Sequence, residues 1–140
     1  MNEKKCLGCF TIEERLPSLN DVIEQNRRNK FKGAAMKRGI DDVIALYIYK
    51  SISKETIRAI DEPIEVYIDW YESNKKRDAD NIHSSVKFIL DALQKTGIIK
   101  NDNRKYVRQI HHQIHDSDKD AVIVMLCRAG GDTNGKGKTV

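Results

Sequence analysis

The sequence predicts an α/β (α+β) fold, a single small domain in which a mixed four-stranded sheet packs with about three helices. A chain of 140 residues has the size of one domain with a modest core. Apolar side chains alternate along residues 64–70, which is the period of a strand. They recur at three- and four-residue spacing in residues 36–48 and 82–93, which is the period of a helix.

The first half of the chain predicts a strand at residues 7–13 followed by two helices. The first helix opens at Pro17-Ser18 or at Asn20 and ends near residues 30–33, where Gly33 is expected to loosen the chain. The second helix is indicated by apolar residues at helical spacing. These are Met36, Ile40, Val43, Ile44, Tyr47 and Ile48.

The second half predicts three strands and one helix. A strand at residues 64–71 follows Pro63, and a helix at about residues 81–95 is ended by Gly97. Two further strands are expected at about residues 106–115 and 121–127. Residues 130–140 are rich in Gly, Lys and Thr and predict a disordered tail, so the domain itself is expected to span residues 1–129.

Acidic residues cluster around the helix predicted at residues 81–95. Asp78 and Asp80 follow the strand before this helix, and Asp91 and Asp102 lie further along. Carboxylates brought together repel one another unless a cation lies between them, and Mg²⁺ or Mn²⁺ prefers such hard oxygen ligands. The structural alternative is that the Asp78–Asn81 stretch caps a helix and Asp102 only forms a turn.

The string around these acids resembles the RusA-type Holliday junction resolvases. That family's pattern is approximately R-D-x-D-N, a lysine, D-A-L, a glycine and an acidic pair. The matching residues are Arg77-Asp78-Ala79-Asp80-Asn81, Lys87, Asp91-Ala92-Leu93, Gly97 and Asn101-Asp102. Leu16-Pro17-Ser18-Leu19-Asn20 also looks like the family's Pro-x-x-Asn segment, so the resemblance covers about residues 16–110.

The resemblance implies a metal-dependent endodeoxyribonuclease that resolves four-way DNA junctions by paired, symmetric nicks. Asp78, Asp80 and Asp102 would bind Mg²⁺, or Mn²⁺ as an alternative, with Asp91 as a further candidate ligand. A homodimer is expected, because two nicks on opposed strands require two active sites.

Lys87 is the family's candidate for offsetting negative charge that develops during cleavage. Many members place this lysine four residues after the second Asp, where this chain has Ser84. Lys87 instead keeps the spacing to Asp91, which indicates extra residues before it. The alternative is a surface ion pair between Lys87 and Asp91.

Basic residues predict contacts with DNA, although a solvated helix face would give the same pattern. The candidate DNA-binding residues are Asn20, Arg27, Arg28, Lys30, Lys32, Lys76 and Arg77. A second basic patch spans residues 100–108. Two other functions remain open: a catalytically silent nucleic-acid-binding module, and a DxD-type nucleotide-sugar transferase.

The remaining composition predicts a cytoplasmic protein with no membrane segment. No apolar run approaches the roughly 20 residues of a membrane span. The odd number of cysteines favours reduced thiols. Cys6 and Cys9 could belong to a zinc site, but on one strand their side chains are expected to point to opposite faces.

Overall fold

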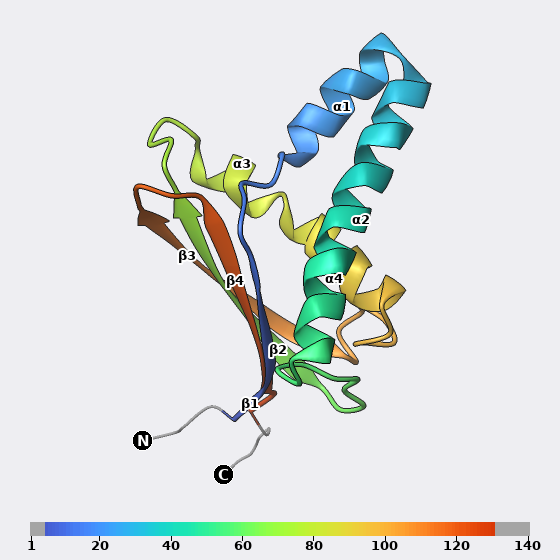
Figure 1. The fold of residues 1–140 in the computed structure, drawn as a ribbon, viewed down its shortest axis with the longest axis vertical. Coiled ribbons are helices and arrows are strands. Elements are labelled where there is room, and N and C mark those ends of the chain that lie inside the picture. Colours follow the sequence, from blue (N-terminus) through green and yellow to red (C-terminus); the bar gives the residue numbers. More distant parts are fainter. Residues whose placement is uncertain (1–4, 131–140) are drawn as a thin grey trace.

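The computed structural model describes residues 5–130 and confirms the fold class: a single small α+β domain built on one open four-stranded mixed sheet. Three helices of ten or more residues and one five-residue helix accompany the sheet. In chain order, the elements are β1 (Cys6–Ile12), α1 (Leu19–Arg28), α2 (Lys30–Ser53), β2 (Ile64–Glu72), α3 (Ala79–His83), α4 (Val86–Lys95), β3 (Val107–Asp116) and β4 (Ala121–Arg128) (Figure 1).

The strands are arranged in the order β1-β4-β2-β3. β4 pairs antiparallel with both β1 and β2, whereas β2 and β3 run parallel. The parallel register sets Ile64 beside Val107 at one end and Glu72 beside Asp116 at the other. The chain between β2 and β3 must therefore return along the sheet, and α3 and α4 carry it back (Figure 1).

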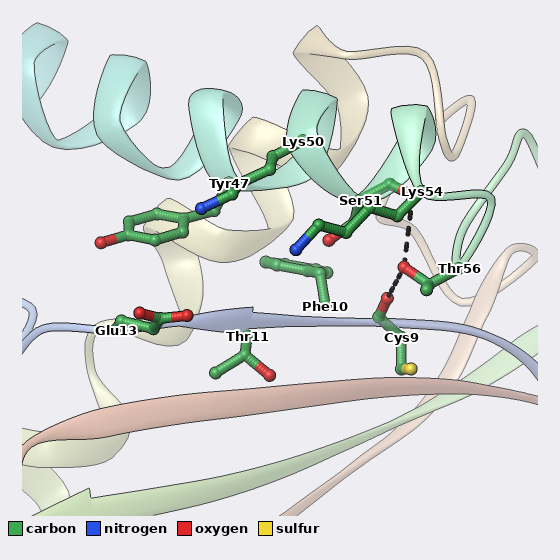
Figure 2. Close-up of a pocket in the computed structure, with 9 residues that line it drawn as sticks. All are labelled: Cys9, Phe10, Thr11, Glu13, Tyr47, Lys50, Ser51, Lys54 and Thr56. Carbon is green, nitrogen blue, oxygen red and sulfur yellow. Dashed lines mark hydrogen bonds between the residues drawn. The ribbon is translucent and has the colours of Figure 1, made fainter.

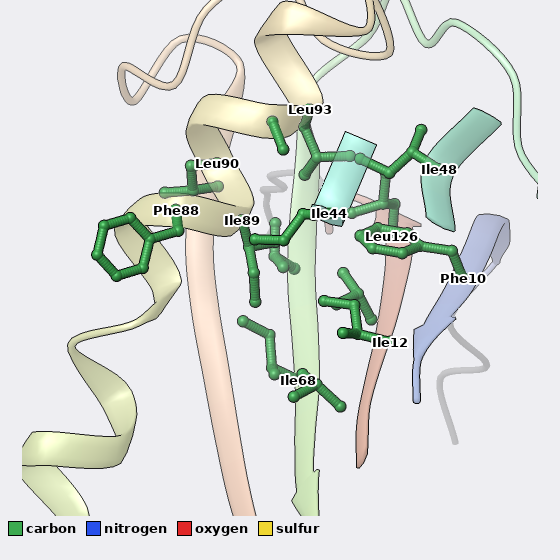
Figure 3. Packing of buried hydrophobic residues seen from close by; sticks show 14 of the residues in the cluster. Phe10, Ile12, Ile44, Ile48, Ile68, Phe88, Ile89, Leu90, Leu93 and Leu126 are labelled. Carbon is green, nitrogen blue, oxygen red and sulfur yellow. The ribbon is translucent and has the colours of Figure 1, made fainter. Parts of the chain in front are cut away.

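The core lies between the sheet and the helices, which occupy one side of it (Figure 1). The alternation expected for β2 is confirmed, since Ile64, Val66, Ile68 and Trp70 are all buried. α4 contributes a buried stripe to the same cluster (Figure 3). Its members are Phe88, Ile89, Leu90, Ala92 and Leu93.

Helices α1 and α2 form a tight hairpin, so the expectation of a chain loosened around Gly33 is wrong. Asn29 is the single residue between the helices, and its Oδ1 accepts hydrogen bonds from the Phe31 and Lys32 N–H groups. Gly33 lies within α2 and packs on Asn26, where a Cβ would come within 2.7 Å of the Asn26 side chain. α1 has no buried residue of its own, and this close packing holds its end against α2.

Two boundaries are decided by side-chain hydrogen bonds. Ser18 caps α1 in a reciprocal arrangement with Asp21, so the helix starts at Leu19. The helix expected at residues 81–95 is divided into α3 and α4 at Ser84 and Ser85. The Ser84 hydroxyl accepts a hydrogen bond from the Leu19 N–H, and the Ser85 hydroxyl donates one to the Pro17 carbonyl. The break between the helices therefore coincides with contacts to a distant part of the chain.

The strand β1 contains an irregularity between Cys6 and Gly8. Cys6 pairs with Cys127 and Cys9 with Met125, two residues that share a face of β4, so Cys6 and Cys9 lie on one face. The expectation that their side chains point to opposite faces is therefore wrong. Burial, followed by the nearby Cys6 thiol, raises the pKa of Cys9.

The described part of the chain ends at Gly130. Gly130, where the predicted tail begins, donates its N–H to Glu65 Oε2 at 3.2 Å, and the rest of that segment lies outside the described residues. Within residues 5–130, every helix is too short or too polar to cross a membrane.

Candidate functional site

The loop that leaves β2 is anchored on both sides by charged groups. Glu72, the last residue of the strand, is 3% exposed, and its carboxylate accepts hydrogen bonds from Arg77 Nη1 at 3.0 and 3.3 Å. Burial raises the pKa of Glu72, although the Arg77 guanidinium opposes that rise. Ser73 donates both its N–H and its hydroxyl to the Asp120 carboxylate, at 2.8 and 3.0 Å. This double anchor fixes the approach to Asp78.

Asp78 and Asp80 are exposed at the start of α3. Asp78 occupies the N-cap position, but its side chain makes no capping hydrogen bond. Neither carboxylate forms an ion pair or hydrogen bond with any residue in the described range 5–130. Two uncompensated carboxylates two residues apart are hard oxygen donors that suit a divalent cation.

We call residues 73–81, from the end of β2 into the first turn of α3, the acidic loop, and the N-terminal segment contacts it directly. Asn20 Nδ2 donates to Asn81 Oδ1 at 3.0 Å, and the Leu19 N–H donates to Ser84 Oγ at 3.0 Å. Ser85 Oγ donates to the Pro17 carbonyl at 2.7 Å. The two stretches that carry the family resemblance, about 60 residues apart in the chain, are therefore in contact.

Asp102 does not join Asp78 and Asp80 within one chain, contrary to expectation. It lies in the turn before β3, where the Ile64 N–H at the start of β2 donates to the Tyr106 carbonyl. Asp78 and Asp80 follow the other end of β2. β2 has nine residues and a strand rises roughly 3.3 Å per residue, so these ends lie about 26 Å apart. The parallel pairing of β2 with β3 imposes this separation.

Lys87 lies on the first turn of α4 and forms the surface ion pair with Asp91 that was the alternative to a role in cleavage. The Nζ–Oδ1 distance is 3.5 Å and the lysine side chain is 56% exposed. Asp91 is also bound by Lys37 of α2 at 3.1 Å, and Lys37 in turn pairs with Asp41 at 2.9 Å. Asp91 therefore joins two helices through cations rather than facing the other acids.

A histidine pair next to the acidic loop was missed by the sequence reasoning. His83, the last residue of α3, stacks on His112 of β3 with ring centroids 4.0 Å apart. Trp70 Nε1 donates to His112 Nδ1 at 2.9 Å. Burial, followed by the neighbouring His83 and His111, lowers the pKa of His112 to about 4. The available signal was that His112 interrupts the apolar stripe of Ile110 and Ile114.

The candidate DNA-binding residues fall into three groups. Exposed on the α1–α2 hairpin are Arg27, Arg28, Lys30 and Lys32. Lys76 is exposed on the acidic loop, and Asn20 contacts that loop through Asn81. Arg77 is different, because its side chain is only 9% exposed and is committed to Glu72. In this structure its guanidinium is engaged in a buried ion pair and is not presented to a phosphate.

The number of acids that lie together limits the size of a metal centre at this site. Among the described residues, no three His, Cys, Asp or Glu side chains are grouped so as to hold a metal ion, so the candidate metal centre consists of Asp78 and Asp80. A groove of about 220 Å³ lies elsewhere, between β1 and the second half of α2 (Figure 2).

No protein-family model matches the chain, and no curated protein is similar enough to count as a match.

Proposed function

We propose that this protein is a Mg²⁺-dependent endodeoxyribonuclease that cuts four-way DNA junctions. The observation that carries the proposal is the acidic loop, in which Asp78 and Asp80 are exposed and unpaired while the residues beside them are fixed. Exposed carboxylates without a cation repel one another and repel DNA, which is a cost unless a metal binds there.

The family resemblance supplies the substrate class. Its two separate parts, Leu16 to Asn20 and Arg77 to Asn81, lie against each other through the Asn20–Asn81 hydrogen bond. Contact between two stretches so far apart in the chain is expected if both serve one site. The resemblance also supplies a homodimer, since two opposed nicks need two sites related by a two-fold axis.

Two carboxylates are sufficient for the proposed metal. Mg²⁺ is commonly bound through one or two carboxylates together with waters and substrate phosphates. When bound, the ion would polarise the scissile phosphate and lower the pKa of an attacking water. Asp78 and Asp80 would hold it, with no contribution from Asp102 of the same chain.

Other residues of the chain would position the acidic loop or bind the DNA phosphates. Glu72 and Arg77 fix the loop, and Asn20 steadies Asn81 from the opposite side. The ion pair of Lys87 is long and half exposed, so its ammonium is free to turn to a phosphate and offset negative charge.

All three cysteines are free thiols, which supports a reducing, cytoplasmic location as part of the proposal.

The second candidate is a nucleic-acid-binding module without catalysis. It is favoured because, among the described residues, no third potential ligand is grouped with Asp78 and Asp80 so as to hold a metal ion. The two candidates differ in their need for metal. End-labelled four-way junction is incubated with the protein in Mg²⁺ or in EDTA, beside linear duplex of the same sequence. We expect paired nicks in the junction in Mg²⁺ alone, whereas junction that is bound but never cut would favour the binding module.

A further inference from the structure

The end of the α1–α2 hairpin exposes an aromatic ring. Phe31, in the first turn of α2, is 73% exposed, the largest exposed fraction among the large hydrophobic side chains of the described chain. A single exposed hydrophobic side chain is common on protein surfaces, so the argument for this ring depends on the residues beside it. We call residues 27–32 the hairpin tip.

The hairpin tip also contains four cations. Arg27, Arg28, Lys30 and Lys32 are all exposed, and Lys30 Nζ lies 5.5 Å from the centre of the Phe31 ring. The neighbouring acid, Glu24, is only loosely paired with Arg27 and Arg28, at 4.0 and 3.8 Å. The hairpin tip therefore offers strong positive charge around one apolar group.

Helix stability accounts for Arg27 and Arg28, which lie in the last turn of α1, but not for the cations of α2. The first turn of α2 contains Lys30 and Lys32 and no acidic residue, although a helix dipole disfavours cations at that end. Phe31 at the same place gains little burial, since it is 73% exposed. When local preferences are broken without a structural gain, a binding role is the physical alternative.

The hairpin holds the tip at a defined distance from the acidic loop. Asn29 caps α2, and Gly33 packs on Asn26, so the arm is rigid. α1 has ten residues and starts at Leu19, which is hydrogen-bonded to Ser84 beside the loop. At 1.5 Å per residue, the tip lies about 15 Å from that hydrogen bond, or roughly four base pairs at 3.4 Å each.

We propose that Phe31 stacks on a base at the branch point of the DNA, where a duplex arm opens, while the four cations bind the phosphates around it. The inference rests on the proposed function for its substrate. It adds a residue that favours a branch point over the continuous part of a duplex, because stacked base pairs within a duplex leave no base face uncovered. Stacking of a base on an aromatic side chain is independent of sequence, as junction recognition requires.

Positive charge would also suit an anionic membrane, but the apolar group is too small for that partner. Interfacial helices bury a whole apolar face of several large side chains. The hairpin tip has one ring, and its other members are Arg27, Arg28, Asn29, Lys30 and Lys32. Nucleic acid is the partner that needs many cations and a single stacking group.

The test is binding without cleavage, measured in EDTA with four-way junctions that carry 2-aminopurine at the branch point. Phe31→Ala is compared with wild type and with Leu46→Ala, a matched control on the same helix whose side chain is 68% exposed. We expect Phe31→Ala to abolish most of the fluorescence change. It should also lower the preference for junction over linear duplex by about tenfold, with an unchanged salt dependence.

Replacing Arg27, Arg28 and Lys30 together with alanine should act differently, because it removes charge. The slope of log affinity against log salt should fall by about 0.9 for each phosphate that the protein no longer neutralises. The stacking proposal is overturned if Phe31→Ala behaves as Leu46→Ala does. It is also overturned if Phe31→Ala weakens binding to phosphatidylserine vesicles but not to junctions. Stacking that persists in a protein without cleavage activity would support this inference while removing the nuclease proposal alone.

Discussion

Glu72 and Arg77 form a buried ion pair with an Nη1–Oε1 distance of 3.0 Å, which closes the loop that presents Asp78 and Asp80. Its partners are five residues apart, so the pair ties the end of β2 to the start of α3. A buried charge pair is a modest source of stability compared with an apolar pair of the same size, but removal of one partner strands the other charge. The pair thereby couples the integrity of the loop to that of the fold.

Arg77→Ala should lower the free energy of unfolding by about 3–5 kcal/mol, because it leaves the Glu72 carboxylate buried without a cation. Lys76→Ala, a change in the exposed neighbour, should alter it by less than about 0.5 kcal/mol. Urea unfolding measures both. Adding Glu72→Gln to Arg77→Ala should restore part of the lost stability. Equal stability of Arg77→Ala and Lys76→Ala would exclude a buried ion pair.

Gly33→Ala should destabilise the hairpin by about 1–3 kcal/mol, because its methyl group would press on Asn26 at 2.7 Å. Gly39 is the matched control on the same helix, since a methyl group there meets nothing within 4 Å. Gly39→Ala should stabilise α2 by up to about 1 kcal/mol. Urea unfolding and amide exchange in α1 check both changes. Stabilisation of similar size in both variants would mean that α1 does not pack closely on α2.

The depressed pKa of His112, about 4, predicts a loss of stability in acid. The unfolded chain takes up the proton near the ordinary pKa of 6.5, so the contribution is present above that pH and is lost as pH falls toward 4. Because the ring is partly exposed, we expect roughly 1 kcal/mol. Wild type should lose this much more than His112→Gln between about pH 7 and about pH 4.5 in urea unfolding. Parallel pH profiles would show that His112 does not contribute.

Lys87→Ala should lower the single-turnover cleavage rate by about 10²-fold, as the loss of one charge-stabilising donor does, with less change in DNA affinity. The control is Lys95→Ala at the far end of the same helix, where the lysine pairs with Asp42 at 2.7 Å. That variant should cleave at nearly the wild-type rate. Wild-type cleavage at saturating DNA in Lys87→Ala would leave Lys87 as a surface partner of Asp91 only.

The sequence was sufficient to predict β2 and the helix that contains α4, but not the break between α3 and α4. Alternation along β2 and helical spacing in α4 have single periods, so both predictions were confirmed. The break between α3 and α4 depends on Ser84 and Ser85 bonding to a segment more than 60 residues away. Local patterns carry no record of such long-range hydrogen bonds.

The acidic site was predicted in part for the same reason. Asp78 and Asp80 are neighbours in the sequence, and their place after a strand could be predicted from its pattern. The position of Asp102 depends on whether β3 pairs with β2 in the parallel or the antiparallel sense. Periodicity is identical for the two senses, so the sequence could not tell that Asp102 lies at the opposite end of the sheet.

The most direct measurement is the nicking of a labelled four-way junction in Mg²⁺ by wild type, Asp80→Asn and Asp102→Asn. We expect Asp80→Asn to bind the junction without cutting it, because one of the two proposed metal ligands is lost and repulsion of phosphate falls. Asp102→Asn should cut at the wild-type rate, since Asp102 lies near the start of β2 and the acidic loop follows its other end, with a strand of about 26 Å between them. Wild-type nicking by Asp80→Asn in the same buffer would contradict a metal-dependent site at Asp78 and Asp80.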